Sequence, residues 1–300
     1  MCTSVYLDDG FFGRTLDYER GFGEVVITSP RSSFYFGDAG NRYASMGVGV
    51  IRDGYPMYFD GMNEWGLCGA ALDFTGSAEY SFSGEGIEAG RLLAFVLGFC
   101  RDTDEVQNAV ERLGVAGGAD NTPLHWMIAD KRRAIVIEST AHGLDIREHR
   151  VGVLTNSPSI DYHMTRLSDY ASLSASMPKN HLLELGVRAC YRGLGAFGLP
   201  GDYSSPSRFV RASFLRENTI TVDNGVTGLF HILGGVSIPL GASLSESGLP
   251  ISTIYTSVMD MEELAYYFTT YNNPRPIKIR LDPEKYEGGD VKTVEMGCIL

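Results

Sequence analysis

The alternation of apolar and polar residues divides the chain into blocks of strands and blocks of helices. Short runs rich in valine, phenylalanine and tyrosine, bounded by glycine-containing turns, fill the first quarter of the chain and are typical of strands. They predict strands over 2–7, 11–17, 24–28, 43–51, 55–60 and 67–74. Apolar residues then recur at helical spacing, which predicts helices over 86–100 and 103–113. Before the second helix, Asp102 and Glu105 form the sequence signature of a helix N-terminus.

The rest of the chain also alternates between groups of strands and groups of helices. We expect strands over 124–129, 134–138 and 151–155, helices over 161–173, 207–217 and 226–236, and final strands over 253–259, 265–271 and 277–281. Because strands and helices do not alternate one by one, the pattern indicates an α+β protein with mainly antiparallel sheets. A four-layer αββα sandwich suits a chain of 300 residues. No repeat or linker composition divides the chain, so we expect a single domain over 1–300.

The balance of charges limits the partners of the chain. It has 25 Lys and Arg residues against 37 Asp and Glu residues, a net charge of −12. Such a field repels nucleic-acid phosphates and anionic lipids, so we expect neither nucleic acid nor a membrane as a partner. No apolar run approaches the roughly 20 residues that span a bilayer, and the start lacks a secretory signal pattern. We therefore expect a cytoplasmic protein.

The cysteines and histidines show no metal-binding pattern. The five cysteines and six histidines are scattered without a CxxC pair or an HExxH motif. We therefore expect no metal site, no cofactor and no disulfide framework. His125, in the apolar stretch LHWMIAD, is interpreted as a core histidine with satisfied hydrogen bonds.

The first predicted hairpin places Cys2 opposite a carboxylate. The dipeptide Asp9-Gly10 between two apolar runs favours a two-residue turn, because both turn residues then need positive φ. Counting outward from that turn pairs Cys2 with Asp17. Arg14 falls on the opposite face in this register, and it reaches the thiol only if a bulge shifts the pairing by one residue.

Cys2 has a specific chemical use at this position. Removal of Met1 would leave a thiol and a free α-amine on one residue, and an α-amine titrates near ~7.7–8.0, close to neutral pH. Asp17 could then hold the ammonium group, and Arg14 could favour the thiolate. The residues alone leave another interpretation open, in which Cys2 is a small apolar residue that starts a buried strand.

Several stretches resemble the choloylglycine hydrolase family, which contains bile salt hydrolases and penicillin V acylases. These stretches are MCT, FGRTLDYE, YFDGMNEWGLCGAALDF, LHWMIAD, GVLTNSPSIDYH, GLPGDYSSPSRFVRASF, FHILGGVSIPLG and TIYTSVMD. They extend in order from the first residues to about residue 260. The resemblance implies the N-terminal nucleophile hydrolase fold, hydrolysis of a linear amide, and assembly as a homotetramer.

The resemblance also assigns roles to individual residues. It places the nucleophile on Cys2, the thiol-contacting arginine on Arg14 and the amine-contacting aspartate on Asp17. Asn156, which follows the apolar run VGVL, matches the asparagine whose side-chain amide binds the oxyanion. Arg208 matches the arginine of the SRF stretch. These five residues are the expected catalytic set, together with a sixth at position 73.

Position 73 departs from the family pattern. This chain has Asp73 in ALDF, where bile salt hydrolases resemble GLNF and penicillin acylases often have tyrosine. The family uses the main-chain amide at this position as the second oxyanion donor, so another side chain need not abolish it. A carboxylate here would oppose an oxyanion and an anionic substrate. It could be protonated, turned toward Arg208 or Arg14, or linked to a different preference for the leaving group.

The substrate signals conflict. ALDF is closer to bile salt hydrolases, whereas VSIPLG resembles the acylase side of the family. We expect Leu16, Phe22, Tyr58 and Phe59 to line the acyl pocket, and we expect hydrolysis of glycine- or taurine-conjugated bile salts through a Cys2 thioester. Penicillin V or another N-acyl amide is the alternative substrate. Two other classes are a glutamine amidotransferase domain, which usually starts with CG, and a non-catalytic sterol- or acyl-binding protein on the same fold.

Overall fold

Two large sheets form the centre of the protein. The computed structural model describes residues 1–300 except 81–85, 119–121, 189–191, 222–224, 283–286 and 299–300. The first sheet has seven strands in the order β14-β1-β2-β16-β17-β18, with β15 paired to β16. Its strands are β1 (Cys2–Leu7), β2 (Phe11–Tyr18), β14 (Val153–Leu154), β15 (Ser243–Leu244), β16 (Pro250–Asp260), β17 (Ala265–Thr270) and β18 (Asn273–Arg280).

The second sheet has eight strands in the order β13-β12-β11-β8-β7-β6-β3-β19. Its strands are β3 (Val25–Ser29), β6 (Ser45–Arg52), β7 (Tyr55–Asn63), β8 (Cys68–Asp73), β11 (Leu124–Ala129), β12 (Ala134–Thr140), β13 (Gly143–Glu148) and β19 (Lys292–Glu295). The pairings in both sheets are antiparallel. Two short pairs complete the strands: β4 (Tyr35–Phe36) with β5 (Ala39–Gly40), and β9 (Ile87–Glu88) with β10 (Val115–Ala116).

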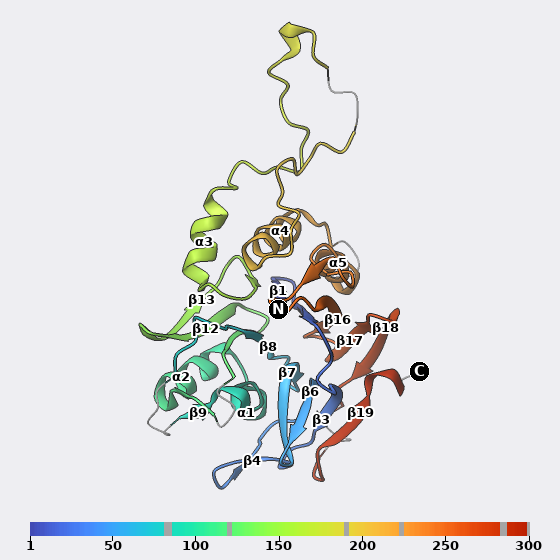
Figure 1. Ribbon diagram of the computed structural model, residues 1–300. Coiled ribbons are helices and arrows are strands. Elements are labelled where there is room, and N and C mark those ends of the chain that lie inside the picture. Colours follow the sequence, from blue (N-terminus) through green and yellow to red (C-terminus); the bar gives the residue numbers. More distant parts are fainter. Residues whose placement is uncertain (81–85, 119–121, 189–191, 222–224, 283–286, 299–300) are drawn as a thin grey trace.

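Helices cover the outer faces of both sheets (Figure 1). The α-helices are α1 (Leu92–Phe99), α2 (Thr103–Leu113), α3 (Ile160–Ser168), α4 (Ser205–Asn218) and α5 (Gly225–Gly234). The described residues also form the short helices η1 (Ala89–Arg91), η2 (Leu183–Leu185) and η4 (Met296–Cys298), and η2 lies in the loop that projects away from the sheets. Helix α1 packs on β7 and β8 of the second sheet, whereas α4 and α5 pack on strands of the first. The predicted four-layer αββα arrangement is therefore confirmed.

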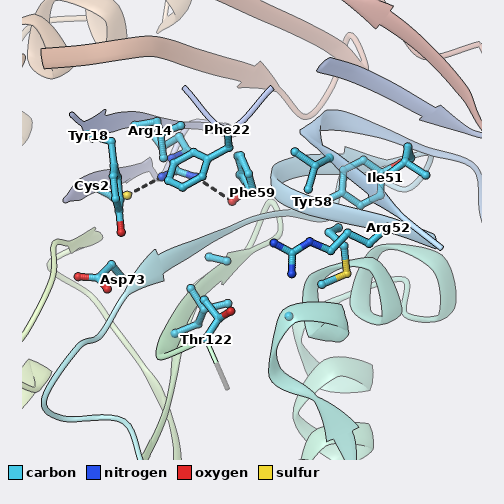
Figure 2. Close-up of a pocket in the computed structure, with 16 residues that line it drawn as sticks. Cys2, Arg14, Tyr18, Phe22, Ile51, Arg52, Tyr58, Phe59, Asp73 and Thr122 are labelled. Carbon is cyan, nitrogen blue, oxygen red and sulfur yellow. Dashed lines mark hydrogen bonds between the residues drawn. The ribbon is translucent and has the colours of Figure 1, made fainter. Parts of the chain in front are cut away.

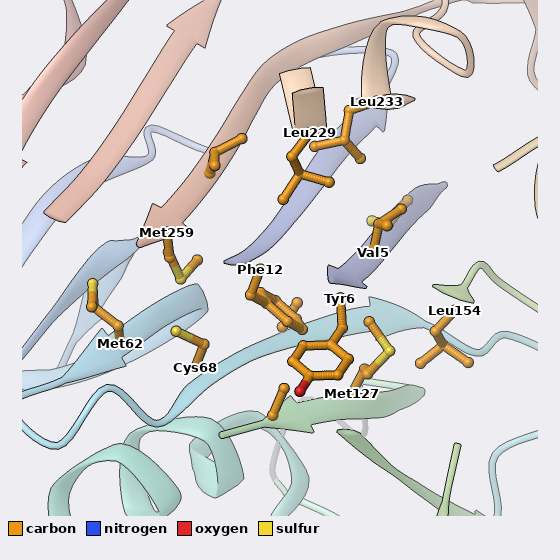
Figure 3. Packing of buried hydrophobic residues seen from close by; sticks show 14 of the residues in the cluster. Val5, Tyr6, Phe12, Met62, Cys68, Met127, Leu154, Leu229, Leu233 and Met259 are labelled. Atoms are coloured by element: carbon orange, nitrogen blue, oxygen red, sulfur yellow. The ribbon is translucent and has the colours of Figure 1, made fainter. Parts of the chain in front are cut away.

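The apolar core lies in two clusters. One fills the space between the sheets and beneath α4 and α5, where Phe12 and Val5 of the first sheet, Met127 of the second and Leu229 of α5 contribute side chains (Figure 3). The other joins the second sheet to α1 and α2. Strands β1 and β2 lie in the middle of this stack and are buried along almost their whole length, so chemistry at their ends is held by the core on both sides.

Two predicted helices are shorter in the structure. The range 86–100 begins as strand β9 and η1, and only Leu92–Phe99 is α-helical, because β9 pairs with β10. The range 161–173 ends as a helix at Ser168. There the Ser168 hydroxyl donates to the carbonyl of Thr165, and serine and aspartate side chains of this kind compete with helical backbone bonding.

Candidate active site

The first hairpin brings Cys2 and Arg14 to the same face. The loop between β1 and β2 has three residues, 8–10, and ends in Gly10 with φ +91°. A left-handed glycine closing a three-residue loop shifts the register by one relative to a two-residue turn. Cys2 therefore pairs with Leu16, and the predicted pairing with Asp17 was wrong. Because alternate residues of a strand share a face, Arg14 points to the side of the thiol.

Arg14 is the direct partner of the thiol. Its Nη2 lies 2.6 Å from Cys2 Sγ, and its Nη1 donates to the carbonyl of Phe59 at 2.9 Å. Burial opposes the charge of the guanidinium, but Cys2, Tyr255 and Asp60 together raise the pKa of Arg14 above its usual value. A permanent cation at this distance is placed to stabilise negative charge that develops on the sulfur during a reaction.

A buried carboxylate that the sequence analysis missed lies behind Arg14. Asp60 of β7 lies 3.8 Å from Arg14 Nη1. It accepts hydrogen bonds from the hydroxyls of Tyr255, Ser257 (3.1 Å) and Tyr266 (2.5 Å). Burial raises the pKa of Asp60, whereas Arg14 and these hydroxyls lower it. The sequence does contain a signal for this residue, because an acidic residue inside an otherwise apolar strand such as MYFDGM needs buried partners.

Replacing Asp60 by alanine is expected to destabilise the protein strongly. The change leaves the buried guanidinium of Arg14 without its carboxylate and three hydroxyl donors without their acceptor. We expect the free energy of unfolding to fall by about 3–5 kcal/mol. Urea unfolding of Asp60→Ala measures this, with Ser257→Ala as the control that removes one hydrogen bond and costs about 1 kcal/mol. Equal losses in the two variants would contradict the role of Asp60 as counter-ion.

Asp17 lies on the opposite face of β2. Its carboxylate accepts hydrogen bonds from Thr15 Oγ1 (3.0 Å) and Thr253 Oγ1 (2.6 Å), and it lies 3.9 Å from Arg208 Nη1. All of these groups are buried. The contact between Asp17 and a free amine on Cys2 stays a prediction.

Arg208 ties the first strand to α4. Its Nη1 donates to the carbonyl of Cys2 at 2.5 Å and to Thr3 Oγ1 at 2.6 Å, and its Nη2 donates to Asn156 Oδ1 at 2.7 Å. Burial lowers the pKa of Arg208, and the charge of Asp17 raises it in part. The side chain therefore holds the main chain of the candidate nucleophile in place.

The side chain of Asn156 has both ends occupied. Its Oδ1 accepts from the nitrogen of Cys2 at 2.7 Å and from Arg208, so its Nδ2 points the other way and donates to the carbonyl of Asp73 at 2.9 Å. Its main-chain N–H donates to Ser205 Oγ at 2.9 Å, and that hydroxyl donates back to its carbonyl at 2.8 Å. Asn156 thus lies between the nitrogen of the candidate nucleophile and the end of β8.

Asp73 ends β8 at the edge of the same site. Its carboxylate accepts a hydrogen bond from Thr75 Oγ1 at 2.5 Å. Among the residues that the structure describes, it forms no ion pair, and Arg14 and Arg208 have other carboxylates as their ionic partners. Of the possibilities raised by the sequence, a side chain turned toward either arginine is therefore not observed.

These residues surround a pocket of about 420 Å³ (Figure 2). Cys2 and Arg14 lie at one end, and Arg52 lies in the wall farther from the thiol. The pocket is lined by Cys2, Arg14, Leu16, Tyr18, Phe22, Val50, Ile51, Arg52, Met57, Tyr58, Phe59, Ala71, Asp73, Gly90, Thr122 and Leu124. The four residues expected in the acyl pocket all belong to this lining, and most of the lining is apolar, as small-molecule sites usually are.

The described residues contain neither a metal-binding cluster nor a membrane-spanning helix. Over the described part of the chain, no group of three or more His, Cys, Asp or Glu side chains is arranged to hold a metal ion. None of the described helices has the length and apolar character needed to cross a membrane. His125 contacts Glu138 Oε1 at 3.0 Å and the carbonyl of Thr155 at 2.9 Å, which confirms it as a core histidine with satisfied hydrogen bonds.

Cys2 is a candidate nucleophile that contacts Arg14 at one end of an apolar pocket. The comparison with protein families agrees with this arrangement. The model of the "linear amide C-N hydrolases, choloylglycine hydrolase family" matches residues 2–294. The chain belongs to the choloylglycine hydrolase family. Choloylglycine hydrolases are linear amide hydrolases, so the prediction of an amide-cleaving enzyme is confirmed. The family match also favours this class over the alternative of a glutamine amidotransferase domain.

Relatives within the choloylglycine hydrolase family match over nearly the full chain. A bile salt hydrolase/transferase of Lactiplantibacillus plantarum is 38% identical, over 95% of this chain and 93% of its own length. One from Clostridium perfringens is 35% identical, over 100% of this chain and 98% of its own. The solved structure of a mutant conjugated bile acid hydrolase from C. perfringens has a TM-score of 0.90, with 34% identity over 98% of this chain and 97% of that one. This agreement confirms the N-terminal nucleophile hydrolase fold.

Proposed function

We propose that this protein hydrolyses the amide bond of glycine- or taurine-conjugated bile salts through a thioester on Cys2. The observation that supports the chemistry best is the contact of 2.6 Å between Arg14 Nη2 and Cys2 Sγ at one end of an apolar pocket. Relatives named for bile salts are 32–38% identical, whereas a penicillin V acylase of Pectobacterium atrosepticum is 22% identical over 82% of this chain. We therefore assign bile salts, rather than penicillin V, as the preferred substrates.

The proposed reaction starts with removal of Met1, which turns the nitrogen of Cys2 into a free amine 2.7 Å from Asn156 Oδ1. The thiol proton passes to this amine, and the thiolate attacks the amide carbon. The resulting ammonium gives the proton to the leaving nitrogen, the C–N bond breaks, and a thioester and a free amine result. Water then attacks the thioester with the amine as base, the C–S bond breaks, and the acid leaves.

Other residues in this proposal bind charge or hold the nucleophile. Asn156 Nδ2 and the main-chain N–H of Asp73 are the oxyanion donors, with the second taken from the family resemblance. Arg208 and Asp17 hold the end of β1 from the helix side, through the contacts of Arg208 with the Cys2 carbonyl and the Asp17 carboxylate. The acyl group occupies the pocket walled by Leu16, Phe22, Tyr58 and Phe59. A homotetramer, a cytoplasmic location and a single domain over 1–300 stay predictions.

A release assay tests the proposal. Wild type and Cys2→Ala are compared on glycocholate, taurocholate and penicillin V, with free amino acid or 6-aminopenicillanic acid as the measured product. We expect release from the bile salts by wild type and none by Cys2→Ala. Cleavage of penicillin V alone would replace bile salts by penicillins as the substrate. Release of every product at equal rates by both proteins would contradict the thioester mechanism.

A further inference from the structure

Asn156 links the main-chain carbonyl of Asp73 to the nitrogen of the candidate nucleophile. Asn156 Nδ2 donates to the Asp73 carbonyl at 2.9 Å, while Asn156 Oδ1 accepts from the nitrogen of Cys2 at 2.7 Å. Arg14 and Phe59 contact the site from the sulfur side instead. In Figure 2, the Asp73 carboxylate lies apart from Arg14 and Phe59, with Cys2 and Tyr18 between them. Asp73 therefore adjoins the part of the site where a nitrogen leaves.

The proposed chemistry assigns this region to the leaving amine. The amine of Cys2 delivers a proton to the departing nitrogen, so that nitrogen must lie near the Cys2 nitrogen and Asn156. The acyl group extends the other way, along Leu16 and Phe59. Substituents on the leaving amine consequently pass the end of β8, where the Asp73 side chain lines the pocket.

Among the residues that the structure describes, no cation forms an ion pair with the carboxylate of Asp73. Its hydrogen bond comes from a neutral hydroxyl, Thr75 Oγ1, at 2.5 Å. Tyr18, which also lines the pocket, cannot offset it, because a tyrosine side chain is never a cation; burial and the charge of Asp73 raise the pKa of Tyr18 to about 12. The buried arginines of the site are matched by their own carboxylates, at 3.8 Å from Arg14 and 3.9 Å from Arg208.

We propose that Asp73 selects the leaving amine by charge. Amides whose amine part has a second, positively charged nitrogen, such as the mono-amide of a diamine, are preferred over amides of amines that bear a carboxylate or sulfonate. This inference rests on the proposed function and refines it, because glycine and taurine conjugates are then the less favoured members of the substrate class. A carboxylate attracts an ammonium and repels a sulfonate at the same position with similar strength.

Two amides of cholic acid test the proposal because they differ mainly in charge. One contains taurine and the other contains 1,2-diaminoethane, so both place a two-carbon spacer after the scissile nitrogen. The ratio of kcat/KM for the diamine amide to that for the taurine amide is measured in wild type and Asp73→Asn. We expect the substitution to lower this ratio about 10- to 100-fold, because it removes both the attraction of residue 73 for the ammonium of the diamine amide and its repulsion of the taurine sulfonate. The main-chain N–H at position 73 is unchanged.

Asp38→Asn is the matched control, because it removes the same charge from the exposed turn between β4 and β5. We expect it to leave the ratio within about twofold. In wild type, raising the ionic strength from 50 mM to 500 mM should shrink the ratio, which is a second readout that needs no variant. An unchanged ratio in Asp73→Asn, or an equal change in Asp38→Asn, would overturn the proposal.

Failure of the proposed function gives a different result. If neither cholic acid amide is cleaved and penicillin V is, the bile salt assignment fails, and the same pair of amines is measured as phenoxyacetyl amides. A ratio that falls in Asp73→Asn with those substrates supports the role of Asp73 without bile salts. A ratio that does not fall overturns it.

Discussion

Replacement of Cys2 by alanine is expected to abolish measurable amide hydrolysis, with a loss of about 10³- to 10⁶-fold in kcat, the range seen when a covalent nucleophile is removed. No other described thiol lines the pocket. Cys2→Ser should also lose most activity, because a hydroxyl does not ionise near neutral pH whereas a thiol does. Steady-state release of amine from a conjugated bile salt measures both variants.

Cys100→Ser is the control for cysteine loss in general. Cys100 is buried away from the pocket, and burial raises the pKa of its thiol to about 12. We expect this variant to keep its activity within about twofold, as for a substitution outside the machinery. Intact mass adds a second check, because the mechanism requires a free amine on Cys2. Full activity in protein that retains Met1 would contradict it.

The long periodic elements could be predicted from the sequence. The helix over 103–113 begins and ends where the pattern of apolar residues places it, and Asp102 caps it by accepting from the N–H of Glu105. Strand β13 and strand β19 were missed. Both lie at the edges of the second sheet and are largely exposed. Only Leu144 and Ile146 alternate with polar residues in β13, and Val294 is the one apolar residue of β19, so neither strand has the longer apolar alternation that marks a half-buried strand.

The geometry of the site depends on features that periodicity does not determine. The register of the first hairpin depends on whether Asp8 belongs to the strand or to the loop, a difference of one residue that decides which face Arg14 takes. The start of α4 shows the same limit, since the helix begins at Ser205 rather than at the expected residue 207. Asp60 contacts residues almost 200 positions away, such as Tyr255, and no local pattern identifies that pairing.

The departure at Asp73 shows what the sequence could and could not supply. The ALDF stretch marks the residue as unusual, but the sequence leaves three explanations open because the surroundings of the side chain come from distant segments. The structure places Thr75 on its carboxylate and Asn156 on its carbonyl, and so separates it from both arginines. The motif therefore identifies the position, whereas only the contacts show which groups the side chain can meet.

Replacement of Asn156 by aspartate is expected to lower kcat by about 100- to 1000-fold, the usual cost of losing one oxyanion donor. In the wild type, Asn156 Oδ1 accepts from the nitrogen of Cys2 and from Arg208 Nη2, both at 2.7 Å, and the variant keeps an oxygen acceptor for these two donors. It loses the Nδ2 donor and places an oxygen against the Asp73 carbonyl. Single-turnover kinetics with a bile salt amide measure the acylation rate directly.

Alkylation of Cys2 by iodoacetamide separates this effect from damage to the nucleophile, because alkylation forms no oxyanion. We expect Asn156→Asp to be alkylated within about threefold of the wild-type rate while its acylation rate falls 100- to 1000-fold. Ser157→Ala is the neighbouring control, since its hydroxyl donates to the Thr75 carbonyl at 2.7 Å and contacts no proposed catalytic group. If alkylation and acylation fall together in Asn156→Asp, the residue acts by holding Cys2 in position, and the oxyanion is stabilised by other donors.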